Sequence, residues 1–369
     1  MKKLLYLTTS IDHRDYSFLL KNGIRTANPS NQNFHAKAIK AISTNFEVSV
    51  FSFVPFYTNN KTLVSNSKYT YINHPKNILD KCFAYKELKT ACQKQEGPFE
   101  AIIFDPMNIA LCKIAIYARK MFKAPIIPIL TDNPYNISSL PEKKAHKMIS
   151  LAKEADASIT LAQSLTRIFG LEAKPNKIIP GIADENDIKA FEADKPYFYF
   201  AGSLLEKYGV KTLIDSYEDS ALDQDLYIAG HGKSGVAGNK NIHFLGQVSY
   251  EENVAYQKGA IAVINPRPYD QKLDSESVPS KMFEYIANAK AIISTENAFF
   301  EKEFSAQINW IGDGSSNDFA KLWNNYKENG LLEISDAARK EFIEKYNGES
   351  FAKNVISLLT LLTQAKSIR

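Results

Sequence analysis

The chain has 369 residues, of which 44% are hydrophobic and 23% charged, and its net charge is +4 at pH 7. This length accommodates two α/β domains, and this composition excludes an intrinsically disordered chain. The small basic excess does not indicate a nucleic-acid partner, but it is compatible with an anionic substrate or a membrane surface. No apolar run reaches the length of a membrane span, and the three cysteines lack metal-ligand spacing. We therefore expect reduced thiols in a cytoplasmic protein.

Short apolar segments alternate with amphipathic segments along the first half of the chain. Residues 11–35 are polar and irregular, and we expect them to form a long loop on the ligand side of a sheet. The expected strands are 4–8, 46–53, 69–72, 101–104, 126–130, 157–161 and 177–179, and the expected helices are 36–43, 77–95, 109–122 and 142–153. This alternation predicts a parallel, doubly wound sheet.

A charged, poorly periodic segment at 183–196 is interpreted as an interdomain linker. A second α/β series follows it, with expected strands at 197–201, 226–229, 242–245, 260–264 and 291–294, and expected helices at 210–217, 250–258, 318–328, 335–346 and 351–366. The sequence thus predicts two Rossmann-like domains, residues 1–182 and 197–348. Ligands of such folds bind at the carboxyl ends of the strands.

The most informative stretch is a loop that leads into a helix start. Pro279 suits the first turn of a helix, and Ser280 and Lys281 add a hydroxyl donor and a charge to its free N–H groups. This combination predicts a phosphate site. Glu276 precedes it in the expected loop and Glu284 lies one turn into the helix, and both carboxylates suit sugar hydroxyls better than phosphate.

Glu276 and Glu284, separated by seven intervening residues that include Pro-Ser-Lys, resemble the donor-site signature of retaining glycosyltransferases of the GT-B fold, family 4 (group 1). The resemblance implies an acceptor-binding domain at 1–182 and a nucleotide-sugar-binding domain at 197–348, facing a cleft. It also implies that a final helix, about 349–369, crosses back to the N-terminal domain. Retention of anomeric configuration and no essential metal or other cofactor are further implications.

Other parts of the family pattern follow in order. Gly202, Ser203 and Lys207 resemble the glycine loop after the first strand of the nucleotide domain, although the family usually has arginine at the position of Ser203. The alternative is a plain strand–turn–helix junction with an exposed lysine. Gly230 resembles the second strand end of that domain.

Gln247 and Val248 resemble the third strand end, where the family's backbone meets the base. Arg267 follows the next expected strand, and we hypothesise that it replaces the charge missing at Ser203. A surface arginine paired with Asp270 or Asp274 is the alternative.

In the N-terminal half, Asp105 and Asp132 each follow an apolar strand and precede a proline or Asn-Pro. The resemblance implies that a polar residue near such positions touches the donor sugar or the acceptor hydroxyl. The alternative for both is a helix cap or turn aspartate. His35 lies where the family's first helix begins, and it is interpreted as a capping or packing residue.

The resemblance implies transfer of a sugar from a nucleotide diphosphate sugar, with a UDP-sugar favoured, to a glycan or lipid-linked glycan acceptor in bacterial surface polysaccharide or glycoconjugate synthesis. The implied phosphate contacts are Val278, Pro279, Ser280 and Lys281, while Glu284 binds ribose and Glu276 binds the transferred sugar.

Two alternatives remain open: a nucleotide-sugar epimerase or hydrolase of the same fold, and a non-catalytic partner subunit. The basic residues Lys143, Lys144 and Lys147 are compatible with a peripheral contact at the inner membrane face or with a solvated helix face.

Overall fold

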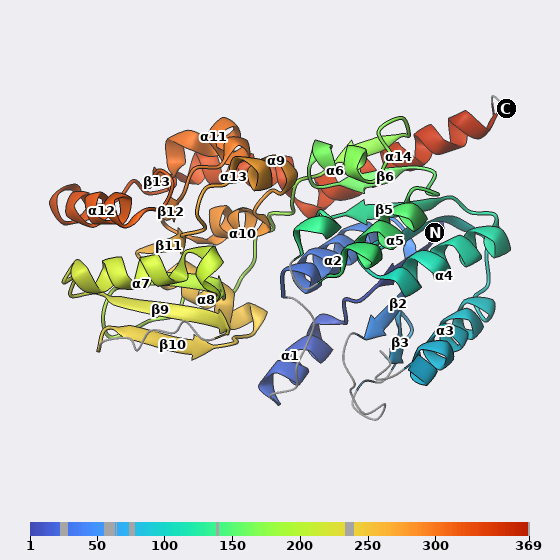
Figure 1. The fold of residues 1–369 in the computed structure, drawn as a ribbon, viewed down its shortest axis with the longest axis horizontal. Helices are drawn as coiled ribbons and strands as arrows, with labels where there is room; N and C mark the ends of the chain where they lie inside the picture. Colours follow the sequence, from blue (N-terminus) through green and yellow to red (C-terminus); the bar gives the residue numbers. More distant parts are fainter. Residues whose placement is uncertain are drawn as a thin grey trace. The chain divides into compact units, whose positions relative to one another are not determined.

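The computed structural model describes residues 1–22, 29–54, 63, 65–73, 78–137, 140–232 and 240–367. The chain forms two compact units (Figure 1). The N-terminal unit comprises Met1–Ile182, Ser275–Ser280 and Tyr346–Arg369, and the C-terminal unit comprises Ala183–Asp274 and Lys281–Lys345. Each unit is built around its own parallel sheet.

The N-terminal unit has a sheet with the strand order β3-β2-β1-β4-β5-β6-β7, in which neighbouring strands are parallel. Its strands are β1 (Lys3–Thr8), β2 (Glu47–Val54), β3 (Tyr69–Asn73), β4 (Phe99–Phe104), β5 (Ile126–Leu130), β6 (Ser158–Thr160) and β7 (Asn176–Ile178). Its helices are α1 (His13–Lys21), α2 (Pro29–Ile42), α3 (Ile78–Gln93), α4 (Ile109–Phe122), η1 (Pro134–Asn136), α5 (Glu142–Ala152), α6 (Gln163–Ile168) and α14 (Gly348–Ser367).

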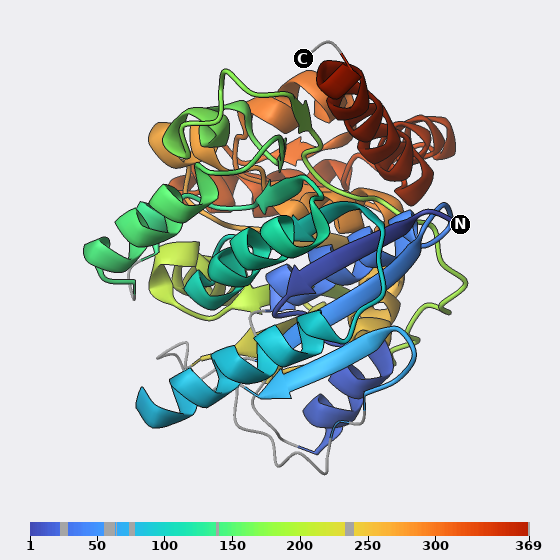
Figure 2. The ribbon, with the colours of Figure 1, turned by 90° about the vertical axis from the view of Figure 1, so that its right-hand side faces the viewer.

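Alternate residues of β1 explain why this sheet is covered on both faces. Leu4 and Tyr6 lie in one hydrophobic cluster, which contains residues of α2 and α14, whereas Leu5 and Leu7 lie in a second cluster with residues of α3 and α4. Successive side chains of a strand point to opposite faces, so a continuous apolar run fills both cores. Figure 2 shows α3 and α4, in cyan to teal, running alongside the strands on one face. The prediction that the final helix packs on the N-terminal domain is confirmed.

The C-terminal unit has a sheet with the strand order β10-β9-β8-β11-β12-β13, again with parallel neighbours. The strands are β8 (Tyr197–Ser203), β9 (Asp225–His231), β10 (Ile242–Gly246), β11 (Ala262–Asn265), β12 (Ile292–Ser294) and β13 (Asn309–Trp310). The helices of this half of the chain are η2 (Glu206–Tyr208), α7 (Val210–Asp219), α8 (Tyr250–Gly259), α9 (Gln271–Glu276), α10 (Ser280–Asn288), α11 (Ala298–Phe304), η3 (Ser305–Gln307), α12 (Ser316–Asn329) and α13 (Asp336–Tyr346). One core of the unit joins β8, α7 and α12 through Phe198, Leu213 and Trp323.

Two expected loops contain helices instead. Within 11–35, helix α1 begins after Asp12, whose Oδ1 accepts the Arg14 N–H at 3.0 Å, and α2 already begins at Pro29. The part of this segment at 23–28 lies outside the described residues. Glu276, expected in a loop, is the last residue of α9. The polar composition of both segments concealed these helices, of which α1 is capped by the Asp12 side chain.

Among the described residues, no helix is both long enough and apolar enough to cross a bilayer.

Candidate active site

Lys281 lies in the first turn of α10 and points at the end of β8. Its Nζ donates to the Ala201 carbonyl oxygen at 2.6 Å and lies 5.7 Å from the centre of the Phe200 ring. Burial lowers the pKa of Lys281 to about 8; the Glu284 carboxylate opposes this shift, and the Arg267 charge adds to it. The helix start therefore carries a cation held beside a strand end, with a second cation within electrostatic reach.

Gly202 and Gly230 make this arrangement sterically feasible. A Cβ at Gly202 would lie 2.4 Å from Lys281 Nζ, and a Cβ at Gly230 would lie 1.7 Å from the Gly202 carbonyl oxygen. The two glycines are paired across β8 and β9. The resemblance implied a phosphate approach for Gly202, and the structure adds a second reason for this glycine, which is space for the Lys281 amine, whereas Gly230 allows the close approach of the Gly202 backbone.

Glu284, one turn further along α10, is only 9% exposed. Its Oε1 accepts hydrogen bonds from Asn253 Nδ2 and Gln257 Nε2, each at 2.6 Å. Burial raises the pKa of the Tyr285 hydroxyl, and the nearby Glu284 carboxylate raises it further. Sequence reasoning missed Asn253 and Gln257. Their spacing of four residues within α8, which places both on one helix face, was the available signal.

The other two candidate cations differ in their surroundings. Lys207 is exposed in the turn η2, with its Nζ 5.2 Å from the centre of the Tyr208 ring. Arg267 is half-buried just after β11, and its carbonyl oxygen accepts the Thr295 hydroxyl at 2.6 Å. Burial raises the pKa of Asp274, and Arg267 lowers it. Arg267 is thus near enough to influence both Lys281 and Asp274, and both interpretations of its role remain open.

Ser203 ends β8, where it pairs with the backbone of His231. Gln247 is exposed and Val248 half-buried in the segment that follows β10. They precede Ser249, which caps α8 by accepting the Glu252 N–H at 3.2 Å. The predicted base contact of Gln247 and Val248 stays a prediction.

Glu276 has two amide partners in the N-terminal unit, with which residues Ser275–Ser280 group. Asn133 Nδ2 and Asn136 Nδ2 each donate to Glu276 Oε2 at 2.7 Å. Asp132, exposed, precedes these residues in the chain. Sequence reasoning singled out Asp132 and missed both asparagines, although two amides flanking Pro134 in a strand-end turn were a signal for polar recognition.

Val278 and Pro279 are half-buried between α9 and α10, and Ser280 is the first residue of α10. We predicted Pro279 in the first helical turn, whereas α10 begins at the next residue, Ser280.

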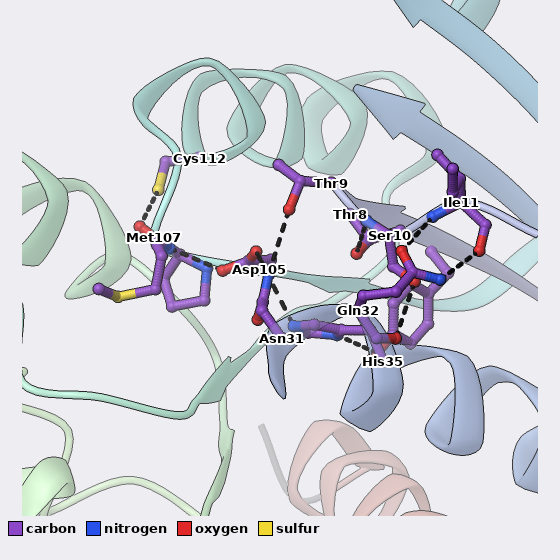
Figure 3. A network of polar contacts seen from close by, with 12 residues as sticks. Thr8, Thr9, Ser10, Ile11, Asn31, Gln32, His35, Asp105, Met107 and Cys112 are labelled. Carbon is purple, nitrogen blue, oxygen red and sulfur yellow. Dashed lines mark hydrogen bonds and ion pairs between the residues drawn. The ribbon is translucent and has the colours of Figure 1, made fainter. Parts of the chain in front are cut away.

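Asp105 belongs to a polar cluster at the carboxyl ends of the neighbouring strands β1 and β4 (Figure 3). Its Oδ1 accepts the Met107 N–H at 2.8 Å and its Oδ2 accepts Asn31 Nδ2 at 3.2 Å. Asp105 Oδ2 also lies 3.8 Å from His35 Nε2, while Tyr6 Oη and His35 Nδ1 are 2.7 Å apart. These contacts are those of a turn aspartate, the alternative interpretation, and a substrate role for Asp105 stays a prediction.

His35 is fully buried within α2, in agreement with a packing role. Burial lowers the pKa of His35, and the Asp105 carboxylate opposes the shift. Among the described residues, no group of three or more His, Cys, Asp or Glu side chains is placed to hold a metal ion.

Comparisons with known proteins address the fold and the class of enzyme. Residues 182–345 match the family model "Glycosyl transferases group 1". The protein is a glycosyltransferase enzyme. No curated protein matches the chain by sequence.

Solved structures resemble the whole chain at low identity. A sucrose-phosphate synthase from Thermosynechococcus elongatus is 14% identical with a TM-score of 0.72, covering 99% of this chain and 100% of that one. Anabaena HepE in complex with UDP and glucose is 12% identical with a TM-score of 0.67, covering 98% and 100%. A trehalose-6-phosphate synthase studied for glycosyl transfer with retention is 11% identical with a TM-score of 0.61, covering 97% and 99%. The predicted α/β class with two parallel sheets of GT-B type is confirmed.

Proposed function

We propose that this glycosyltransferase moves a sugar from a nucleotide diphosphate sugar, with a UDP-sugar favoured, to a glycan or lipid-linked glycan, with retention of anomeric configuration. We place this reaction in bacterial surface polysaccharide or glycoconjugate synthesis in the cytoplasm. The match of residues 182–345 to group 1 glycosyltransferases supports the donor class. The similarity to HepE bound to UDP and glucose favours uridine, and the similarity to the trehalose-6-phosphate synthase favours retention.

The observation that carries the proposal is Lys281, a partly buried cation in the first turn of α10. Negative charge develops on the diphosphate oxygens as the nucleoside diphosphate leaves, and a preorganised cation at a helix N-terminus stabilises that charge. Lys281 is already held at 2.6 Å from the Ala201 carbonyl oxygen, so little reorganisation is needed. Lys207 and Arg267 are the further candidates for this charge stabilisation, which we propose to proceed without an essential metal.

The two signature glutamates are proposed to bind different parts of the donor. Glu284 accepts hydrogen bonds from the ribose, and Glu276 accepts them from hydroxyls of the transferred sugar. The amides of Asn133 and Asn136 on Glu276 are consistent with this role, because amide N–H groups donate to a carboxylate as sugar O–H groups do. We propose same-face attack, in which a donor phosphate oxygen helps to take the proton of the acceptor hydroxyl. The exposed Asp132 is the proposed acceptor-side contact.

The donor class is tested by thermal shift with UDP-, GDP- and ADP-sugars. We expect the UDP-sugar to raise the melting temperature most. No shift with any nucleotide sugar would contradict the proposal. Incubating the donor without acceptor distinguishes a transferase from an epimerase, since rapid isomerisation would show the latter. Activity that survives chelation of divalent metals is the expected result for metal independence.

The roles of the glutamates are tested by kinetics with the donor found in that panel. Glu284→Ala should chiefly raise the KM for the donor, and Glu276→Ala should chiefly lower kcat. The reverse pattern would mean that the two roles are exchanged.

We also propose a peripheral membrane contact through α5. Lys143, Lys144 and Lys147 are exposed on this helix. Basic residues on a helix face attract anionic lipids, with about 1 kcal/mol per residue near the surface. Sedimentation with vesicles containing phosphatidylglycerol tests the contact, and replacement of the three lysines by glutamine should weaken it.

A further inference from the structure

Two amide side chains of α8 converge on one oxygen of Glu284. Asn253 Nδ2 and Gln257 Nε2 both donate to Glu284 Oε1 at 2.6 Å. The two residues are four positions apart in α8, so they lie on the same face of the helix. Because both donors come from one face of α8, they restrain the orientation of the carboxylate.

The amide groups of Asn253 and Gln257 are themselves oriented by further hydrogen bonds. The Tyr199 hydroxyl donates to Asn253 Oδ1 at 2.9 Å, and Asn288 Nδ2 donates to Gln257 Oε1 at 3.2 Å. An amide that turned over would direct its oxygen at the carboxylate, where it cannot donate. The contacts at the oxygen ends therefore keep both NH₂ groups directed at Glu284.

One branch of this network continues into the segment that precedes β8. Asn186 Nδ2 donates to Asn288 Oδ1 at 2.8 Å, and the Asn186 carbonyl oxygen accepts Lys258 Nζ at 2.8 Å. We call the residues Asn186, Asn288, Gln257, Asn253 and Tyr199 the amide relay. Gln257 is 0% and Asn288 7% exposed, so the inner part of the relay is shielded from water, which would otherwise compete for its hydrogen bonds.

We infer that Asn253 and Gln257 are positioning residues that aim the Glu284 carboxylate at the ribose hydroxyls of the donor. This inference rests on the proposed function, in which Glu284 binds ribose. A carboxylate that is already oriented loses little rotational freedom on binding a diol, whereas one that turns freely must be ordered first. The relay therefore determines the preference for ribose, while the diphosphate is bound elsewhere in the unit, at Lys281.

The test compares a nucleoside diphosphate with its 2′,3′-dideoxy form. The probe is whichever of UDP, GDP and ADP binds most tightly. Calorimetry gives the ratio used below, which is the dissociation constant of the dideoxy form divided by that of the ribose form. We expect Gln257→Met and Asn253→Leu each to reduce this ratio about tenfold, as loss of oriented hydrogen bonds to a charged group implies. Affinity for the dideoxy form should change less than about twofold, because its contacts do not involve Glu284.

Asn309→Ala is the matched control. Asn309 is an amide of the same unit that donates to the Ile292 and Leu332 carbonyl oxygens, outside the relay, so its loss should leave the ratio unchanged. Should the two relay variants fail to fold, Asn186→Ala at the half-buried outer end of the relay provides a milder change, for which a smaller fall in the same ratio is expected.

Glu284→Ala separates failure of the inference from failure of the proposed function. If Glu284→Ala makes the two dissociation constants equal while the relay variants leave their ratio at the wild-type value, the inference is overturned and the role of Glu284 stands. If Glu284→Ala itself keeps the ratio, Glu284 does not read the ribose, and the donor role assigned to it fails. Equal weakening of both nucleotides in the relay variants would indicate a purely structural role.

Discussion

The strand ends of the two units use their charged residues in opposite ways. In the N-terminal unit, Asp105 lies at the end of β4 and accepts hydrogen bonds from Met107 and Asn31 beside the buried His35. In the C-terminal unit, the Lys281 amine donates to a backbone carbonyl oxygen, and the missing side chain of Gly202 leaves room for it. A charge that protein groups already surround stabilises the fold, whereas a cation placed beside small residues at a helix start can meet a ligand. The five predictions below test this difference.

The largest effect is expected for the Lys281 amine. Lys281→Met should weaken nucleoside diphosphate binding roughly hundredfold, because it removes the partly buried charge that we propose to contact the diphosphate. The free energy of unfolding should change little, since methionine keeps the apolar stem. Isothermal calorimetry and urea unfolding measure the two quantities. Lys207→Met is the control, and an equal loss for this exposed lysine would contradict the special role of Lys281.

Replacing Asp105 should affect stability instead. Asp105→Ala leaves the Met107 and Asn31 donors without their acceptor, so the free energy of unfolding should fall by about 2 kcal/mol. Nucleotide affinity should be unchanged. Urea unfolding gives the first quantity, with the exposed Asp132→Ala as a control. Weakened nucleotide binding at unchanged stability would assign Asp105 to the site after all.

The pH dependence of nucleotide binding reports on Lys281. The pKa of Lys281 is lowered to about 8 by burial, and a bound diphosphate should raise it, so binding takes up a proton above that pH. Affinity should be constant between pH 7 and 8 and then fall by up to about tenfold per pH unit. Calorimetry in buffers of different ionisation enthalpy detects the proton uptake. The same decline in Lys281→Arg, which stays charged, would assign it to another group.

His35 should show the opposite linkage, to stability rather than to binding. Its folded-state pKa is lowered, so its contribution to stability is complete above the unfolded-state pKa of about 6.5 and is lost as the pH falls below it. We expect the free energy of unfolding to decline below pH 6.5 by at most about 1.4 kcal/mol per pH unit from this residue. Urea unfolding at pH 7.5 and 5.5 should show a smaller decline in His35→Gln. An identical decline would exclude His35 as its source.

The smallest effect is expected for Arg267. If its charge acts on the diphosphate, Arg267→Ala should weaken nucleotide binding about threefold to tenfold and should reduce the salt dependence of binding. Calorimetry at two ionic strengths measures both. Unchanged affinity would favour the alternative, a pairing with a neighbouring carboxylate.

The sequence by itself determined the α/β architecture with two parallel sheets, and it singled out Glu276 and Glu284 as the predicted donor-site signature. Apolar runs that alternate with amphipathic segments indicate parallel strands covered by helices. The strands are apolar on both faces, and the apolar faces of the helices bury them. The predicted phosphate site at 279–281 also rests on local chemistry alone. The helices α1 and α9 were not predicted from the sequence, because tertiary contacts override the local preference of their polar segments.

Only the tertiary structure decided which side chains surround the predicted charges. Gly202 lies near Lys281 because the start of α10 packs at the end of β8, and Gly230 lies beside Gly202 because β8 and β9 pair in the sheet. The four-residue spacing of Asn253 and Gln257 places both on one helix face, but that face meets Glu284 only because α8 packs beside α10. Periodicity is a property of neighbouring residues, whereas an oriented hydrogen bond depends on where two separate segments are brought together. Glu284 could therefore be singled out from the sequence, whereas the meeting with the two amides that donate to it could not.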